Sequence, residues 1–178
     1  TFNLVHRTTV VNNVLMGRLS RVSPWRSTLG LWPAEDREAA MVALERVGIV
    51  EKAYVRASDL SGGQQQRVGI ARALAQEPSL MLADEPVASL DPVTSRQVMG
   101  DLRRINEELG ITTVVNLHFL DLAREYAQRL IGLRDGVLIY DGDIAKVDDD
   151  TFQEIYGRAI TADDLLAVGE EPASPNGD

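Results

Sequence analysis

Two adjacent carboxylates and one histidine are the residues of this sequence best placed to do chemistry. Asp84 and Glu85 follow directly on an apolar run at 80–83, and His118 follows a second run, rich in β-branched residues, at 112–116. Ligands bind at the carboxyl ends of strands in open α/β sheets. Of two adjacent acids at such a point, one can hold Mg²⁺ through water and the other can polarise an attacking water. Taken alone, the pair could equally be two solvated acids that end a strand.

A glycine-rich turn lies upstream of the two acids. We call residues 61–64, with the sequence S-G-G-Q, the glycine turn; it opens a predicted helix at 65–76. Glycines let the backbone approach an anion closely, and the free N–H groups and positive end of a helix favour negative charge. The Ser61 hydroxyl can donate one more hydrogen bond. A lone S-G-G is a weak signal for a phosphate contact, but the full octapeptide at 60–67, L-S-G-G-Q-Q-Q-R, is a strong one.

Strands and helices alternate through the middle of the chain, which predicts an α/β domain with a largely parallel sheet. The predicted strands are 80–83 and 112–116, and the predicted helices around them are 65–76, 95–109 and 120–128. A hairpin that turns at 134–136 predicts an antiparallel edge. His118 thus stands at the end of a strand next to the one that ends in the acids, where it could reach a bound phosphate. His6 has no such setting, and we expect no functional role for it.

The composition is that of an ordinary globular protein. Of 178 residues 44% are hydrophobic and 25% charged, and none is cysteine, which excludes disulfides and thiolate metal sites. No apolar run approaches the roughly 18 residues that cross a bilayer. The net charge of −9 argues against sequence-independent nucleic-acid binding, which needs Lys and Arg to neutralise phosphates. We therefore expect a protein of the cytoplasm that has no nucleic-acid partner.

The first part of the chain, residues 1–59, is predicted to be a mainly helical segment. Apolar residues recur at helical spacing over 8–19 and 35–47. Between these segments an irregular connection holds both tryptophans, Trp25 and Trp32. Their position leaves two interpretations open, since they could pack locally or face a partner.

The last part, residues 158–178, is predicted to be an acidic C-terminal tail. From residue 163 onward it has acids but no Lys or Arg, and it is rich in Pro, Gly, Ser and Asn. Such a composition predicts a solvated segment, with an acidic docking segment as the alternative. Residues 60–157 between the two end regions form the predicted catalytic α/β part.

In their order and spacing, the motifs resemble the ATPase domain of ABC transporters. The resemblance rests on the octapeptide at 60–67, on L-M-L-A-D-E-P at 80–86, on Asp91 and on His118, and it continues more weakly to about residue 157. It implies an ABC-type P-loop NTPase fold, with a mostly parallel sheet and a helical subdomain. It also implies an ABC-type ATPase, a translocase, that uses ATP and Mg²⁺.

The resemblance assigns each motif residue a role. In this family the L-S-G-G-Q stretch of one subunit covers the γ-phosphate of ATP held by the P-loop of the other. Asp84 is similar to the Walker-B magnesium residue, Glu85 to the general base and His118 to the switch histidine. Asp91 matches the aspartate that crosses the dimer interface. The implied nucleotide contacts in trans are Ser61, Gly62, Gly63 and Gln64.

The P-loop itself does not occur in the sequence. None of the 178 residues forms a G-x-x-x-x-G-K-[ST] motif, and the family's adenine-stacking aromatic and its Q-loop glutamine are also absent. Residues 2–4 resemble the segment that comes directly after that glutamine in the family. We therefore expect the chain to be a fragment of a longer protein and an incomplete NTPase domain. In isolation it is expected neither to be a stable monomer nor to bind or hydrolyse MgATP at useful rates.

Finer features are similar to phosphonate importer ATPases. They are E-P-V-A-S-L-D at 85–91, N-L-H at 116–118, R-L-I-G-L-R at 129–134 and the tryptophan-containing insert at 24–33. This resemblance implies an ATPase subunit for phosphonate-type uptake, peripheral to the cytoplasmic face of the inner membrane. Its implied partners are a second ATPase subunit in a homodimer, a transmembrane permease and, indirectly, a solute-binding protein.

Two other functions stay open at this point. The chain could be a non-catalytic module that donates its glycine turn to a complete partner ATPase, and then a change of Ser61 would abolish its effect on the partner. It could also be an ABC ATPase for DNA repair or translation. The absence of a long coiled-coil insert, of a second cassette and of a basic surface disfavours that third function.

Overall fold

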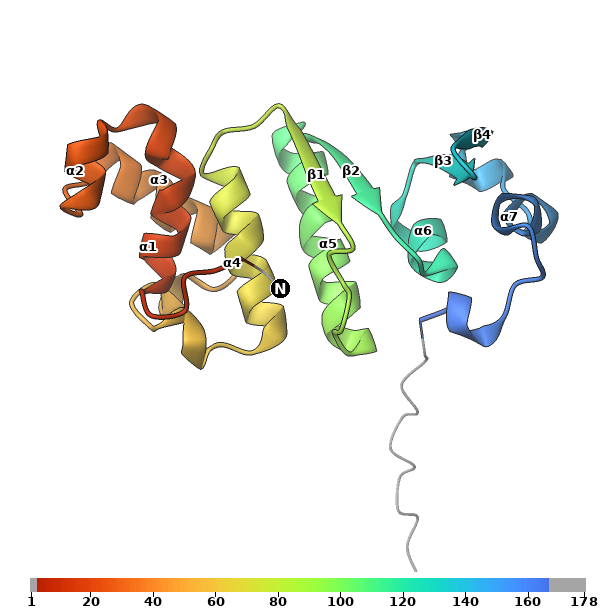
Figure 1. The fold of residues 1–178 in the computed structure, drawn as a ribbon, viewed down its shortest axis with the longest axis horizontal. Helices are drawn as coiled ribbons and strands as arrows, with labels where there is room; N and C mark the ends of the chain where they lie inside the picture. Colours follow the sequence, from red (N-terminus) through yellow and green to blue (C-terminus); the bar gives the residue numbers. More distant parts are fainter. Residues whose placement is uncertain (1–2, 167–178) are drawn as a thin grey trace, which may run out of the picture.

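The structure is a computed structural model that describes residues 3–166, and Figure 1 shows the path of the chain. Helices come first, and strands and helices alternate after them. The elements are α1 (Val10–Leu15), α2 (Pro24–Thr28), α3 (Ala34–Arg46), α4 (Gly62–Leu74), β1 (Leu80–Asp84), α5 (Pro92–Leu109), β2 (Thr112–Asn116), α6 (Leu120–Tyr126), β3 (Arg129–Arg134), β4 (Val137–Asp143) and α7 (Asp149–Tyr156). Short 3₁₀ turns join several of them.

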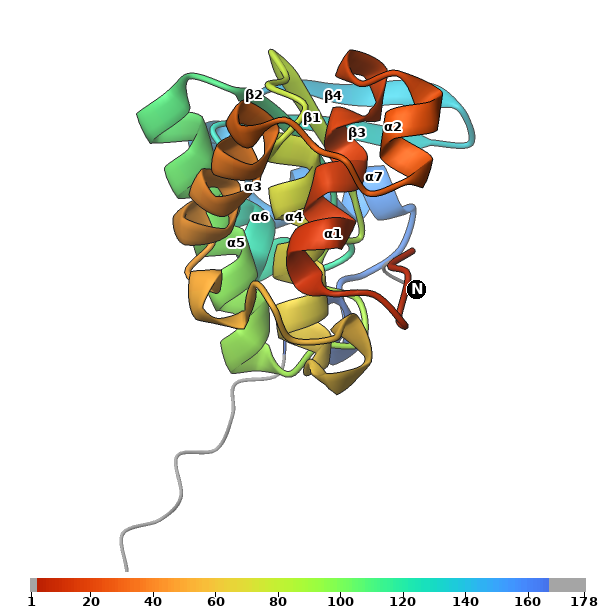
Figure 2. The same ribbon diagram turned by 90° about the vertical axis from the view of Figure 1, so that its left-hand side faces the viewer.

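The first three helices and α4 form the helical part of the molecule. Figure 2 shows α1, α3 and α4 side by side, and each of the three contacts the other two. Their inward side chains are fully buried, including Val10, Val14, Leu44 and Val68. Such burial, at about 25 cal/mol per Å² of apolar surface, is what holds short helices in place, because a helix of six residues such as α1 is not stable alone.

The two tryptophans behave differently. Trp32 packs against the hydrophobic core, whereas Trp25 is 62% exposed. The stretch around Trp25 is not wholly irregular, because Pro24 begins the short helix α2, none of whose residues is buried. Proline fits the first turn of a helix, where its missing N–H has no partner to lose. A helix of five residues is too short to show periodicity in the sequence.

The parallel strands β1 and β2 position the residues of the candidate site. Leu80 pairs with Thr112 and Asp84 with Asn116, so the two strands end side by side. One face of this pair is apolar and exposed: Leu82 is 74% exposed, and Leu80 and Val114 are each about half exposed. Met81, on the opposite face of β1, is buried. The predicted parallel pairing is therefore observed, with one face of the pair covered and the other bare.

The hairpin at β3 and β4 is antiparallel, as its turn predicts. It does not form the edge of the β1–β2 sheet, however. Among residues 3–166 the strands make two separate two-stranded sheets, one of β1 and β2 and one of β3 and β4. In Figure 1 the chain runs from β2 through α6 to β3, and the hairpin stands apart from β1 and β2.

The prediction of a solvated tail from residue 163 onward is wrong for two of its residues. Asp164 and Leu166 are each only 5% exposed. The Asp164 carboxylate accepts two hydrogen bonds from Arg158, both 2.7 Å long, which compensate its burial. The N–H of Leu166 donates to Asp121 Oδ1 at 2.9 Å. Residues 167–178 lie outside the described part of the chain, so the tail prediction for them stays a prediction.

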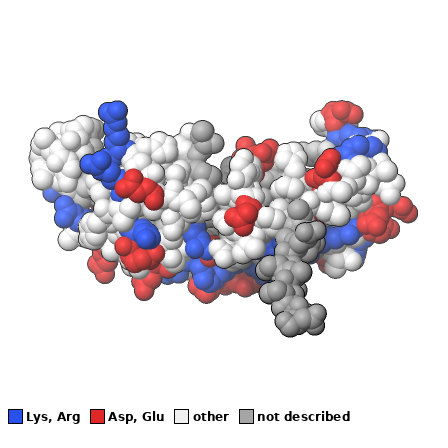
Figure 3. Space-filling model, turned by 90° about the horizontal axis from the view of Figure 1, so that it is seen from below, with Lys and Arg blue, Asp and Glu red and all other residues white. Residues whose placement is uncertain are grey.

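Acidic and basic side chains are mixed on one face of the molecule. Figure 3 shows one long face of the molecule, seen from below, on which acidic and basic groups are interspersed. Within residues 3–166, no helix has the length and the apolar character needed to span a membrane.

Candidate functional site

Asp84 ends β1 at the point where β2 ends beside it. Its Oδ1 accepts a hydrogen bond of 2.8 Å from the side-chain amide of Asn116, its partner in the strand register. The carboxylate is exposed, and within residues 3–166 its second oxygen accepts no side-chain hydrogen bond. Asn116 thus orients a carboxylate that keeps one oxygen turned to solvent.

Glu85 turns the chain away from the strand. Its backbone has φ of +45°, in the left-handed region that residues with a side chain seldom adopt, while its N–H still donates to Asn116 O at 3.1 Å. Strained backbone of this kind persists where the surroundings fix it, and it gathers at functional sites. The turn points the Glu85 side chain towards His118.

Glu85 and His118 form a hydrogen-bonded pair. His118 Nε2 lies 2.8 Å from Glu85 Oε1, and both side chains are exposed to solvent. Because an ionised carboxylate can only accept, Nε2 must carry the proton in this contact. Within residues 3–166, the second carboxylate oxygen of Glu85 has no side-chain hydrogen-bond partner. Asp84, Glu85 and His118 therefore lie at the ends of two neighbouring strands, with Glu85 and His118 in contact, and their roles stay predictions.

A pocket of about 210 Å³ opens beside the pair. Glu85 and His118 line it together with the segment 87–90 and with Leu117 and Phe119. Most of its wall is apolar, with the carboxylate and the imidazole as its ionisable groups. That combination suits a site that orients a polar reactant against a small number of polar side chains.

The glycine turn is the N-terminus of α4. The structure starts this helix at Gly62, three residues earlier than predicted, because Ser61 caps it. Ser61 Oγ accepts from the Gln64 N–H at 3.4 Å, and Gln64 Oε1 accepts from the Ser61 N–H at 3.0 Å. This reciprocal capping box fixes the turn. Ser61 and Gly62 are exposed, so a helix N-terminus suited to an anion faces solvent.

Asp91 begins α5 beside that turn. Its Oδ1 accepts from the Thr94 N–H at 2.9 Å and caps the helix, which starts at Pro92, three residues before the predicted start. Hydrogen bonding from Thr94 holds the pKa of Asp91 below its usual value. Position 62 lies against the next segment, since a Cβ there would stand 3.3 Å from Leu90 Cδ2. The glycine turn and the Asp91 turn are therefore neighbours within one chain.

Three residues with a structural part in this site were not predicted from the sequence. Asn116 holds Asp84, Thr94 lies against the glycine turn, and the hydroxyl of Tyr156 on α7 donates to the backbone carbonyl of His118 at 3.1 Å. The register of the two strands was a usable signal for Asn116, because it ends β2 opposite Asp84. Nothing in the sequence pairs Tyr156 with His118, which lies 38 residues away.

The carboxylates of this site fit a magnesium ion only if water and substrate phosphates supply most of its ligands, as is typical of nucleotide sites. Among residues 3–166 there is no group of three or more His, Cys, Asp or Glu that could hold a metal by itself. Mg²⁺ in such sites keeps several waters and takes one or two carboxylates together with substrate phosphates. The solvent-facing oxygen of Asp84 can supply one such carboxylate ligand.

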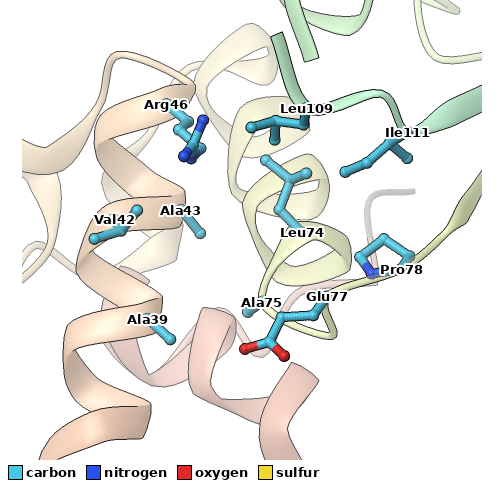
Figure 4. Close-up of a pocket in the computed structure, with 10 residues that line it drawn as sticks. All are labelled: Ala39, Val42, Ala43, Arg46, Leu74, Ala75, Glu77, Pro78, Leu109 and Ile111. Carbon is cyan, nitrogen blue, oxygen red and sulfur yellow. The ribbon is translucent and has the colours of Figure 1, made fainter. Parts of the chain in front are cut away.

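A second pocket, of about 370 Å³, lies elsewhere (Figure 4). It is formed by one side of α3, the end of α4 and the residues around Leu109 and Ile111. Its charged groups are Arg46 and Glu77, and Glu77 is engaged by Arg18 at 2.7 Å. None of the predicted site residues reaches it. We take the smaller pocket as the candidate site because the carboxylate–imidazole pair is there.

Known proteins share these features. The family model described as "ABC transporter" matches residues 1–88. Over 175 residues the chain is 62% identical to the "Phosphonates import ATP-binding protein PhnC" of Shouchella clausii, and the match covers 98% of this chain. The chain belongs to the ABC transporter ATP-binding family. Members of this ABC family are ATPases, so the enzyme class expected from the motifs agrees with the family.

A further ABC relative is the protein of the same name from Staphylococcus saprophyticus, 58% identical over 94% of this chain. The aligned parts are 66% and 65% of the two relatives. The chain therefore spans about two thirds of the length of these curated relatives.

Solved ABC structures agree with the fold. A metal-chelate type ABC transporter in an inward-facing conformation matches 88% of this chain and 61% of its own, with a TM-score of 0.79 and 26% identity. An ATP-binding cassette in a dimeric post-hydrolysis state, bound to ADP and Pi, matches 80% of this chain and 60% of its own, with a TM-score of 0.64 and 36% identity. The α/β ABC-type fold predicted from the sequence is thus confirmed.

Proposed function

We propose that the chain is part of the ATP-binding subunit of an ABC importer that takes up phosphonates. The observation that carries the proposal is the pair of Glu85 and His118, joined at 2.8 Å at the ends of two parallel strands. The 62% identity to a relative named for phosphonate import supports the substrate class.

Each side chain of the site has a step in the proposed hydrolysis. Glu85 accepts a proton from the attacking water through its free oxygen, while His118 holds the other oxygen and so fixes the carboxylate. Asp84, oriented by Asn116, would hold Mg²⁺ through water, and the ion would neutralise charge on the phosphates. A positioned general base of this kind contributes roughly 10²–10⁴-fold to the rate.

The glycine turn and Asp91 act between subunits in this proposal. Ser61, Gly62, Gly63 and Gln64 contact the γ-phosphate of ATP bound to a second copy, and Asp91 reaches across the interface. The exposed, capped start of α4 supports this, because Ser61 and Gly62 face solvent at a helix N-terminus, where an anion is favoured. The proposed assembly is a homodimer on a transmembrane permease, peripheral to the cytoplasmic face of the inner membrane.

We further propose that the chain is a fragment of a longer subunit, which we call the complete subunit. The relatives' greater length supports this, as does the bare apolar face of β1 and β2 around Leu82. Monomeric soluble proteins seldom leave such faces uncovered. The 178 residues contain no P-loop motif, and the chain is expected not to bind MgATP alone. Its three proposed parts are 1–59, 60–157 and 158–178.

The test of the function is uptake. The complete subunit and its permease are placed in liposomes with the solute-binding protein, and uptake of a radiolabelled alkylphosphonate is followed with and without ATP. We expect ATP-dependent uptake that inorganic sulfate does not inhibit. Uptake of a different solute class, with no phosphonate uptake, would contradict the substrate class and leave the ATPase role standing.

Calorimetry of the isolated chain with MgATP tests the fragment proposal. We expect no heat of binding, whereas micromolar affinity would refute the proposal. The alternative function, a module that donates its glycine turn to a complete ATPase, has its own test. In that case the isolated chain would raise the ATPase rate of the complete subunit, and Ser61→Ala would remove the effect.

A further inference from the structure

Gly63 lies in a place where no side chain fits. It is buried, and a Cβ added at this position would lie 2.3 Å from Cγ2 of Thr94. Real Cβ atoms essentially never approach another carbon so closely. Gly63 is on the first turn of α4 and Thr94 is on the first turn of α5. The two helices therefore touch near their N-termini, where the backbone of Gly63 lies against the methyl group of Thr94.

Both sides of this contact are held in place. On α5, Asp91 caps the helix through the N–H of Thr94, and a β-branched residue in a helix has few χ1 rotamers. On α4, Ser61 and Gln64 form the capping box. Further along both helices, Arg67 Nε lies 2.9 Å from Asp101 Oδ2 and ties α4 to α5 a second time. The two helices are therefore joined at two levels.

We propose that Thr94 is a positioning residue that sets the place of the glycine turn relative to Asp91. In this chain Gly63 must be glycine because of the Thr94 methyl group, whatever the turn contacts outside the chain. The consequence for function rests on the proposed ATPase role. The two segments that act on a second subunit there, the glycine turn and the Asp91 turn, move as one unit.

A compensating pair of substitutions tests this in the complete subunit. Gly63→Ala forces its Cβ into Thr94 Cγ2, whereas Thr94→Ser removes that methyl and leaves a hydroxyl at a distance of 3.9 Å from the new Cβ. The proteins compared are the wild type, Gly63→Ala, Thr94→Ser and the double variant. Gly69→Ala is the matched control, because this glycine is on the same helix and an added Cβ there meets nothing within 4 Å.

We expect Gly63→Ala to lower the melting temperature by about 5 °C and the ATPase rate by roughly tenfold or more. The double variant should regain most of both losses. Thr94→Ser alone loosens the contact and should lower both values, but less than Gly63→Ala does. Gly69→Ala should raise the melting temperature slightly, since alanine favours a helix more than glycine does.

Three results would overturn the proposal. One is a Gly63→Ala variant as stable and active as wild type. Another is a Gly63→Ala variant with an unchanged melting temperature whose lost ATPase rate Thr94→Ser does not restore. That result would assign the glycine to a nucleotide contact instead. The third is a double variant that melts no higher than Gly63→Ala. A wild-type complete subunit without ATPase activity would contradict the proposed function, and the melting temperatures of the set would still decide on the contact.

Discussion

His118 Nε2 lies 2.8 Å from Glu85 Oε1, and this hydrogen bond joins the segments that follow two parallel strands. Both residues are exposed, so the pair is open to a ligand as it stands. An imidazole that holds one oxygen of a carboxylate leaves the other oxygen as the base. The pair should therefore behave as a unit.

Glu85→Gln is expected to lower the ATPase rate of the complete subunit by roughly 10²–10⁴-fold while ATP binding is kept, because an amide cannot accept the proton. His118→Ala should also lower the rate. The double variant should be little slower than Glu85→Gln alone, since residues that act as a unit are not additive. Steady-state ATPase assays and ATP titrations measure these effects. Glu107→Gln, on the exposed face of α5, is the control and should leave the rate unchanged.

Asn116→Ala should weaken the response to magnesium. The amide of Asn116 orients Asp84 through a bond of 2.8 Å, and loss of a partner behind a ligand typically costs 10–100-fold in metal affinity. We expect the Mg²⁺ concentration for half-maximal ATPase to rise about tenfold. Asn12→Ala, on the exposed side of α1, serves as the comparison. An unchanged Mg²⁺ curve would mean that Asp84 needs no help from Asn116.

Tyr156→Phe removes the hydroxyl that donates to the His118 carbonyl at 3.1 Å. One lost hydrogen bond of this kind is worth about 1 kcal/mol, so we expect kcat to fall roughly threefold to tenfold. The KM for ATP should stay constant, because Tyr156 acts through the His118 backbone and not on the nucleotide. Tyr54→Phe, at a side chain that is 78% exposed, should change neither constant. A Tyr156→Phe variant with normal kcat would show that the His118 segment is held without this bond.

Asp101→Ala should destabilise the fold. Burial raises the pKa of this carboxyl in spite of its arginine neighbours, and Arg67 Nε and Arg104 reach it at 2.9 Å from two sides. Its removal leaves Arg67 partly buried without its partner, at a cost of about 2 kcal/mol. Urea unfolding of the complete subunit measures the change. Glu107→Ala breaks only an exposed pair with Arg103 and should cost under about 0.5 kcal/mol.

Asp164 gives the protein an acid-sensitive contact. The Arg158 guanidinium and the Thr161 N–H hold the pKa of its carboxyl well below the usual value for aspartate. A depressed folded-state pKa stabilises the fold at pH values above the unfolded-state pKa, about 3.9, and this stabilisation is lost as the pH falls. We expect the melting-temperature difference between wild type and Asp164→Asn to be constant from about pH 5 to 8 and to shrink below about pH 4. A difference independent of pH would show that the carboxylate is not charged in the folded state.

Much of the site could be predicted from the sequence because its residues are local to element ends. Asp84 and Glu85 terminate an apolar strand, so the strand pattern brings them out. Ser61 stood out through the glycine-rich octapeptide at 60–67 and not through helix periodicity. The start of α4 at Gly62 could not be read from periodicity, since it depends on the hydrogen bonds of the capping box. For α5 the start at Pro92 likewise follows from the Asp91 cap.

Contacts between segments that are distant in the sequence could not be predicted from it. Tyr156 and His118, or Gly63 and Thr94, meet only through tertiary packing, and neither pair has a spacing that marks it. The burial of Asp164 was hidden for another reason. The segment around Asp164 has the composition of a solvated segment. Arg158 donates two hydrogen bonds to the Asp164 carboxylate and so compensates the free-energy cost of burying that charge.

The bare face of β1 and β2 links the placement of the acids to assembly. A two-stranded sheet is marginal by itself, and this one carries Asp84 and Glu85 at its end while Leu82 and Val114 stand in water. In the complete subunit proposed above, a polypeptide segment that covers those side chains would also stiffen the strands that hold the carboxylates. The two contacts are then linked. If the covering segment raises the affinity for a ligand that needs the carboxylates in place, that ligand raises the affinity for the covering segment by the same factor.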